Sequence, residues 1–145
     1  KYKRTLTKMA NENSKWVKLY ENVPYKDYVN ILAKCRYGIH YKLEPFGISI
    51  AEMMKAGAIP IVRRKKGKSA GQVEILGEEN QELFFDDQDE AVEKITNILQ
   101  DSEIQEKLQA SLLKRKDLFS TDRFMTGIHQ VVKNYFEQYD ASVIS

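Results

Sequence analysis

The sequence predicts an α/β fold in which helices flank a mostly parallel, Rossmann-like sheet of about four strands. Short runs of β-branched and aromatic residues alternate with longer segments whose apolar residues recur at helical spacing. Because nearly every predicted strand is separated from the next by a helix, parallel pairing is favoured. Parallel sheets bind ligands beyond the carboxyl ends of their strands, so we expect chemistry in loops 40–46, 63–71 and 86–88.

The predicted elements follow in order along the chain. We expect strands at residues 16–20, 37–40, 58–62 and 83–85. We expect helices at residues 2–12, 25–34, 46–55, 89–100, 103–118 and 122–139, and a helical turn at 72–76. Gly57 suits the left-handed position that ends the third helix. Pro60 places the start of a strand, or a locally unpaired position, within 58–62.

Composition narrows the class of protein. The chain has 145 residues, of which 42% are hydrophobic and 30% are charged, so a disordered tail is excluded. The net charge of +2 gives no general reason to expect nucleic-acid binding. A single cysteine, Cys35, excludes an internal disulfide and a cysteine-based zinc site, and it suits a reducing compartment. We see no signal peptide and no apolar run long enough to span a membrane, and the missing initiator Met indicates a piece of a longer chain.

Two carboxylates bracket the start of the third predicted helix. Glu44 comes just before this helix, and Glu52 lies six residues past Phe46, roughly 9 Å along the helix axis. The first turn offers backbone N–H groups at Phe46, Gly47 and Ile48, and a helix N-terminus attracts phosphate. Gly47 lets a ligand approach the backbone. Carboxylates accept hydrogen bonds from vicinal hydroxyls, so this spacing suits a nucleotide-sugar, although surface acids on a packed helix remain an alternative.

The stretch from Glu44 to Val62, Glu-Pro-Phe-Gly-Ile-Ser-Ile-Ala-Glu-Met-Met-Lys-Ala-Gly-Ala-Ile-Pro-Ile-Val, resembles the signature of retaining GT-B glycosyltransferases of family GT4. Residues 70–75, Ala-Gly-Gln-Val-Glu-Ile, resemble the downstream Gly-Gly-x-x-Glu-Ile segment of that family. The resemblance covers most of residues 16–100. It implies that residues 1–120 are the second half of a nucleotide-sugar-binding, C-terminal GT-B domain, followed by a helix and tail at 121–145.

The resemblance also implies roles for individual residues. Glu44 would contact the hydroxyls of the donor sugar and support transfer, and Glu52 would hold the ribose hydroxyls. Phe46, Gly47 and Ile48 would present backbone amides to the sugar and phosphates. The donor would be a UDP- or GDP-linked sugar, and the resemblance implies no metal and no further cofactor.

The whole protein would transfer a hexose from an NDP-sugar to an acceptor hydroxyl with retention of configuration. The resemblance implies that an acceptor-binding N-terminal domain and two strands of the sheet lie outside this chain, so either this piece repacks or a partner chain or segment supplies the rest. We therefore expect these 145 residues alone to be inactive. The alternative is a non-catalytic nucleotide-binding or partner-docking module on the same half-domain.

Three further features are open to interpretation. Four cations follow the third predicted strand: Arg63, Arg64, Lys65 and Lys66. They form either a solvated loop or a contact to a diphosphate or to an anionic membrane surface. We expect a cytoplasmic protein, and the membrane contact would place it at the cytoplasmic membrane face. His40 ends a strand near the predicted site and is interpreted as structural rather than catalytic. A packing face is predicted on the last helix at Phe124, Ile128, Val131, Tyr135 and Tyr139.

Overall fold

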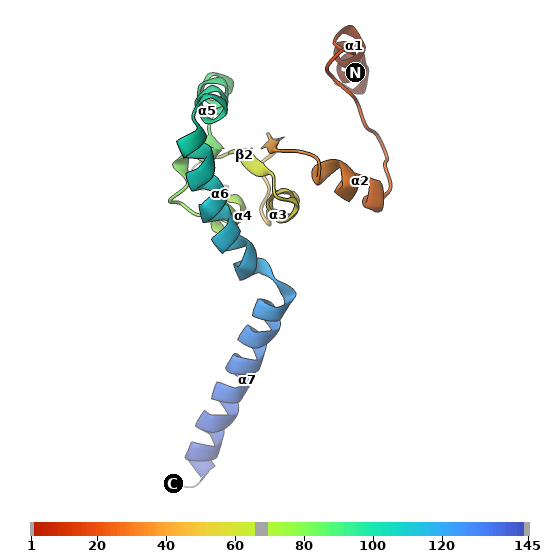
Figure 1. Ribbon diagram of the computed structural model, residues 1–145. Coiled ribbons are helices and arrows are strands. Elements are labelled where there is room, and N and C mark those ends of the chain that lie inside the picture. Colours follow the sequence, from red (N-terminus) through yellow and green to blue (C-terminus); the bar gives the residue numbers. More distant parts are fainter. Residues whose placement is uncertain (1, 66–69, 144–145) are drawn as a thin grey trace. The chain divides into compact units, whose positions relative to one another are not determined.

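The computed structural model describes residues 2–65 and 70–143 (Figure 1). The chain divides into two units, residues 1–31 and residues 32–145, which are described separately. The first unit contains α1 (Tyr2–Glu12) and nearly all of α2 (Tyr25–Leu32). The second unit contains every strand that the structure describes and all the remaining helices.

The strand predicted at residues 16–20 is not formed, and that prediction was wrong. The backbone N–H groups of Trp16 and Val17 both donate to the carbonyl oxygen of Asn13, so the turn that ends α1 continues into this run. Trp16, Leu19 and Tyr20 remain exposed. A strand is stabilised by ladder bonds to a neighbour and by a buried face, and this run has neither among the described residues.

The second unit is built on a three-stranded parallel sheet in the order β1-β2-β3. The strands are β1 (Tyr37–His40), β2 (Ile59–Arg63) and β3 (Phe84–Phe85). In the register, His40 of β1 lies opposite Val62 of β2, and Val62 lies opposite Phe84 of β3. The predicted α/β class with a parallel sheet is confirmed, with three described strands in place of about four.

Helices alternate with these strands as predicted. They are α3 (Ile48–Ala56), α4 (Ala70–Leu76), α5 (Gln88–Gln100), α6 (Ser102–Lys116) and α7 (Thr121–Val143), with 3-10 turns η1 (Gln81–Leu83) and η2 (Asp117–Phe119). Gly57 has φ 90° at the end of α3, which confirms the predicted left-handed cap. Asp101 is both the C-cap of α5 and the N-cap of α6, where its side chain accepts hydrogen bonds from the N–H groups of Glu103 and Ile104.

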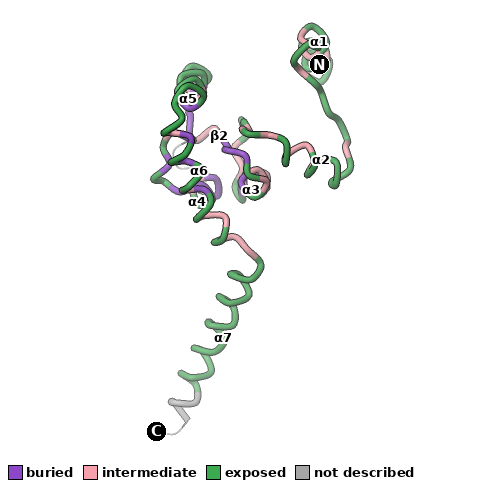
Figure 2. The backbone as a smooth tube through the Cα atoms, viewed as in Figure 1, coloured by how far each residue is buried: buried purple, intermediate pink, exposed green. Residues whose placement is uncertain are grey.

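The hydrophobic core surrounds β2, which is drawn in purple in Figure 2. Residues 59–62 are all buried, which is typical of a central parallel strand covered on both faces. Contacts to β2 come from α3 and α6, and α5 contacts β3 and α6. The core side chains include Ile50 and Met54 of α3, Phe84 and Phe85 of β3, Ile98 of α5, and Leu108 and Leu112 of α6.

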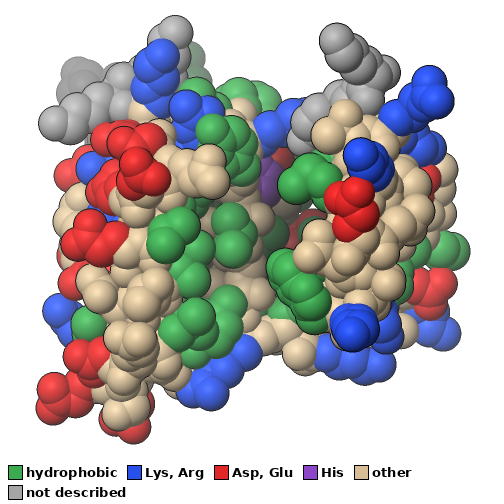
Figure 3. Space-filling model, turned by 90° about the horizontal axis from the view of Figure 1, so that it is seen from above, with side chains coloured by type: hydrophobic (Ala, Val, Ile, Leu, Met, Phe, Trp, Pro, Cys, Tyr) green, Lys and Arg blue, Asp and Glu red, His purple; other side chains and the backbone are tan. Residues whose placement is uncertain are grey.

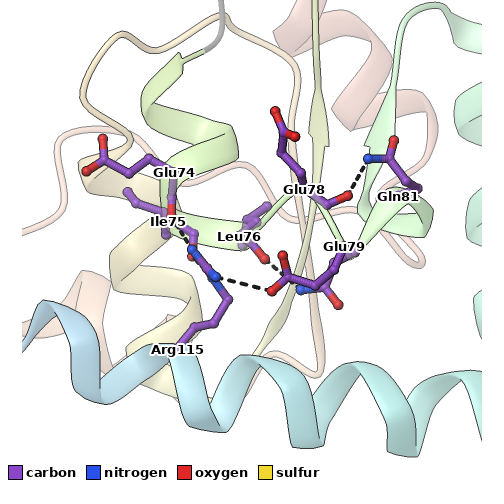
Figure 4. Close-up of polar contacts among 8 residues, drawn as sticks. Glu74, Ile75, Leu76, Glu78, Glu79, Gln81 and Arg115 are labelled. Atoms are coloured by element: carbon purple, nitrogen blue, oxygen red, sulfur yellow. Dashed lines mark hydrogen bonds and ion pairs between the residues drawn. The ribbon is translucent and has the colours of Figure 1, made fainter.

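Arg115 of α6 fixes the end of α4 (Figure 4). Its Nε donates to the carbonyl oxygen of Ile75 at 2.7 Å, and a second guanidinium nitrogen donates to the carbonyl oxygen of Glu74. The remaining nitrogen lies 3.2 Å from the carboxylate of Glu79. The last carbonyl groups of a helix have no intrahelical partner, so one side chain of α6 satisfies two of them.

The last helix differs from the others in its burial. No residue of α7 whose side chain is described is buried, and the helix is green along this length in Figure 2. The five apolar residues predicted to form a packing face are all exposed. The space-filling view also shows hydrophobic side chains reaching the surface among acidic and basic ones (Figure 3). The apolar pattern of α7 is present, but within the described residues nothing covers it.

Candidate functional site

The candidate site is the loop that joins β1 to α3 at the carboxyl edge of the sheet. β1 ends at His40 and α3 begins at Ile48, so residues 41–47 form this loop. Helix α3 therefore begins two residues later than predicted, and its first amide groups are those of Ile48, Ser49 and Ile50. With this start, Glu52 lies about 6 Å further along the axis at 1.5 Å per residue.

The Glu44 carboxylate is held by two side chains from different elements. Ser49 of α3 donates its hydroxyl to Oε1 of Glu44 at 2.9 Å, and Nε2 of His40 lies 3.3 Å from the same oxygen. The side chains of His40 and Glu44 are 14% and 26% exposed. Oε2 of Glu44 has no hydrogen bond or ion pair with any residue that the structure describes.

The loop backbone rests on the start of α4. Gln72 is fully buried, and its side-chain amide donates to the carbonyl oxygen of Lys42 at 3.0 Å. Nδ1 of His40 lies 2.9 Å from the same carbonyl oxygen. A Cβ on Gly71 would lie 2.0 Å from the carbonyl oxygen of Pro45, so only glycine permits this approach. The two sequence segments noted above, 44–62 and 70–75, therefore meet in space.

Gly47 is required for two structural reasons. It has φ +67°, the left-handed region that favours glycine, and it caps α3. A Cβ there would lie 2.5 Å from Cδ1 of Ile75 and 3.1 Å from the carbonyl oxygen of Gly71. A side chain at position 47 would therefore point towards α4. Because glycine has none, α4 can pack closely there.

The other predicted site residues surround the first turn of α3. Phe46 and Ile48 are 81% and 66% exposed, so both side chains are accessible to a ligand. Glu52 lies one turn beyond Ile48 on the same face of α3 and is half-buried. The structure thus brings together Glu44, Phe46, Gly47 and Ile48 at the beginning of the helix, with Glu52 one turn further along.

Two basic residues at the end of β2, Arg63 and Arg64, are packed against neighbouring aromatic rings. The guanidinium of Arg63 lies 4.6 Å from the ring centroid of Tyr41, and its Nε donates to the carbonyl oxygen of Asp86. The guanidinium of Arg64 lies 5.1 Å from the ring centroid of Phe84. Lys66 lies outside the described residues. A contact of Arg63, Arg64, Lys65 and Lys66 with an anionic membrane surface stays a prediction.

An ion pair occupies the region after β3. A hydrogen bond from Lys94 lowers the pKa of Glu90, and the backbone N–H of Asp86 lowers it further. The Glu90 carboxylate lies 2.8 Å from Nζ of Lys94 and accepts the Asp86 N–H at 2.7 Å. Nζ of Lys94 also donates to the carbonyl oxygen of Phe84 at 2.5 Å, so this pair anchors α5 to β3.

Sequence reasoning missed three residues of this arrangement. Ser49 and Gln72 were not singled out, and His40 was interpreted as structural without a partner. The clue for His40 was its place at the carboxyl end of a strand, four residues before Glu44. Nothing local could have identified Gln72, because its contact to Lys42 spans 30 residues. Within the described residues, no group of three or more His, Cys, Asp or Glu side chains could hold a metal ion.

Comparison with known families supports the resemblance at the level of the glycosyltransferase family. The family model of glycosyl transferases group 1 matches residues 1–115. The chain belongs to this family. Neither the curated proteins nor the solved structures include a significant match. Membership in the group 1 glycosyltransferases supports glycosyl transfer as the general function, and the parallel sheet flanked by helices is consistent with a glycosyltransferase domain of Rossmann type.

The family match ends before the last helix. It covers both units up to Arg115, the residue that anchors α4, and α7 lies beyond it.

Among the described helices, none is both long enough and apolar enough to cross a membrane.

Proposed function

We propose that this group 1 glycosyltransferase chain is the donor-binding portion of a retaining, GT4-like enzyme that transfers a hexose from a UDP- or GDP-sugar to an acceptor hydroxyl. The observation that carries the proposal is the placement of Glu44 and Glu52 about the first turn of α3, at the carboxyl edge of a parallel sheet. Glu44 would accept hydrogen bonds from hydroxyls of the donor sugar, and Glu52 from hydroxyls of the ribose.

The backbone of the first turn would bind the phosphates that lie between these two sugars. A helix N-terminus carries partial positive charge and unpaired N–H groups, and both favour a diphosphate. In a retaining transfer, the bond between the anomeric carbon and the diphosphate oxygen breaks, and the nucleoside diphosphate leaves with the electron pair. The acceptor hydroxyl oxygen forms the new bond to the anomeric carbon on the same face, and its proton passes to the departing diphosphate. Donors directed at the leaving oxygens stabilise this developing charge. The backbone amide of Ile48 in the first turn, together with those of Phe46 and Gly47 directly before the helix, would contribute these donors.

An NMR titration of the ¹⁵N-labelled chain with UDP-glucose and with GDP-mannose tests this proposal. We expect saturable chemical-shift changes clustered at residues 44–52 with one of the two donors, which also identifies the base. Glu52→Gln should weaken this binding about tenfold, as expected for the loss of a charged hydrogen-bonding partner. Glu93→Gln makes the same chemical change at an exposed position of α5 and serves as the matched control.

Three outcomes would contradict the proposal. One is a well-dispersed spectrum without saturable shifts for either donor. Another is an equal loss of affinity in the Glu52→Gln and Glu93→Gln variants. The third is binding of the nucleoside diphosphate and the NDP-sugar with equal affinity in both wild type and Glu44→Ala, which would favour a nucleotide-binding module that does not use the sugar.

A further inference from the structure

We propose that His40 and Ser49 are positioning residues that hold Glu44 by its Oε1 and leave Oε2 to accept hydroxyl groups of the donor sugar. This inference rests on the donor-binding function proposed above and deepens it. The evidence is the convergence of two side chains on one carboxylate oxygen. Ser49 Oγ donates a hydrogen bond to it at 2.9 Å, and His40 Nε2 lies 3.3 Å from it, an ion pair when the imidazole is protonated. Oε2 has no such contact with any described residue.

The two side chains come from elements that are fixed independently. His40 is the last residue of β1, where it lies opposite Val62 of the buried strand β2. Ser49 is the second residue of α3, which is anchored in the core by Ile50 and Met54. The Glu44 carboxylate is therefore held between the end of a strand and the start of a helix.

The imidazole of His40 also links the carboxylate to the loop backbone. Its Nδ1 lies 2.9 Å from the carbonyl oxygen of Lys42, and its Nε2 faces Glu44. Both partners are acceptors, so each ring nitrogen forms its hydrogen bond only when it carries a proton. Gln72 donates to the same Lys42 carbonyl oxygen at 3.0 Å and holds that peptide group from the side of α4.

We call the contacts of His40 and Ser49 with Glu44 the clamp. This clamp improves donor binding because a glutamate side chain otherwise loses rotamer freedom when the ligand binds. With Oε1 already occupied, the carboxylate is oriented before the sugar arrives. The predicted effect is therefore specific to the sugar. Removal of the clamp should weaken binding of the NDP-sugar and leave binding of the nucleoside diphosphate unchanged, because the diphosphate and ribose do not contact Glu44 in the proposed arrangement.

Two matched pairs of variants separate positioning from mere stability. In His40→Gln, the new amide nitrogen can occupy the place of Nε2 and donate to Glu44, whereas in His40→Asn it can reach only the place of Nδ1. Ser49→Thr keeps a hydroxyl donor, and Ser49→Ala removes it. For each variant, the dissociation constants of the UDP- or GDP-sugar and of the corresponding diphosphate are measured by NMR titration, with spectral dispersion as the check on folding.

We expect His40→Asn and Ser49→Ala to weaken NDP-sugar binding about tenfold, the loss typical of one hydrogen bond to a charged group. His40→Gln and Ser49→Thr should stay near wild type, and diphosphate binding should be unchanged in all four. In a Glu44→Ala background, His40→Asn should have no further effect, because a positioning residue acts only through the group that it positions.

The other outcomes distinguish this inference from the proposed function. The inference is overturned if His40→Asn weakens NDP-sugar and diphosphate equally, or if its effect persists in the Glu44→Ala background. It is also overturned, with the proposed function intact, if Glu44→Ala weakens NDP-sugar binding while His40→Asn and Ser49→Ala do not. If Glu44→Ala binds NDP-sugar as wild type does, the assigned role of Glu44 fails and the inference fails with it.

Discussion

The sheet core and α7 both carry large apolar side chains, but these are buried in the core and exposed on α7. Phe84 of β3 is 1% exposed, whereas Phe124 of α7 is 66% exposed. The difference does not come from the side chains, since both are phenylalanine, but from what surrounds them. In the core, α3, α5 and α6 cover β2 and β3 from several directions, and within the described residues nothing comparable covers α7.

This contrast shows that amphipathic spacing specifies a face without specifying its partner. The energy of burial is realised only where a second element is present, so stability should be concentrated between β1 and α6. The following predictions test this division by making matched changes in the two regions.

The largest effect is expected from truncation of a core aromatic side chain. Phe84→Ala leaves a cavity beside β2 and should lower the free energy of unfolding by about 3–5 kcal/mol. Phe124→Ala removes the same atoms from an exposed helix face and should change it by less than about 0.5 kcal/mol. Urea unfolding followed by circular dichroism measures both, and a similar loss in the two variants would show that α7 is packed in solution.

A second comparison uses two glycines. Gly71→Ala places a methyl group 2.0 Å from the carbonyl oxygen of Pro45, and because the obstacle is backbone, we expect a loss of about 3 kcal/mol. Gly127 of α7 has no atom within 4 Å of such a methyl group, so Gly127→Ala should stabilise the helix by about 0.5–1 kcal/mol. Thermal unfolding of both variants measures the two changes in stability, a loss for Gly71→Ala and a gain for Gly127→Ala. Unchanged amide shifts at 42–47 in Gly71→Ala would contradict the contact between α4 and the loop.

Loss of the Arg115 anchor should have an intermediate effect. Arg115→Ala leaves the carbonyl groups of Glu74 and Ile75 without their donor, and we expect a loss of about 2 kcal/mol. Lys133→Ala in α7 removes only an exposed pair with Glu137 and should cost less than about 0.5 kcal/mol. Hydrogen exchange of the α4 amides should accelerate in the first variant only.

The smallest effect concerns pH. The lowered pKa of Glu90 means that its ionised form stabilises the folded chain above about pH 4.3, the ordinary glutamate value, and that this contribution disappears as pH falls through the lowered pKa. Glu90→Gln should therefore reduce the acid sensitivity of unfolding, by less than about 1 kcal/mol because the pair is partly screened by solvent. Glu137→Gln, which changes the corresponding exposed pair of α7, is the control. Identical acid profiles for wild type and Glu90→Gln would contradict the expectation.

The sequence predicted those parts of the fold that depend on local chemistry. The bounds of α1 and β1 agree with the prediction, and Gly57 has the left-handed conformation that was expected at the end of α3. The strand prediction at 16–20 is wrong because strand propensity is not sufficient there: the turn after α1 captures the first two N–H groups of this run. Propensity is decisive only where a neighbouring strand is available.

The charged residues of the candidate site were predictable from the sequence, but the way they are arranged was not. Glu44, Glu52 and the start of a helix could be identified from spacing. In the structure, Glu44 precedes the start of α3 and Glu52 lies one turn after it. The clamp on Glu44 joins a strand end, a loop and a helix, and the support of Lys42 comes from Gln72 in a later segment. Such contacts depend on how β1, α3 and α4 pack, and periodicity along one segment carries no information about them.

Asp101 alone separates α5 from α6, and it caps both helices. Their junction therefore behaves as a rigid corner whose angle is set by a single residue rather than by a loop of variable length. An added residue there would rotate α6 by about 100° about its own axis, given 3.6 residues per turn, and would turn Leu108 and Leu112 away from the core. The chain should accordingly accept insertions poorly at this corner, although it lies at the surface where loops usually tolerate them.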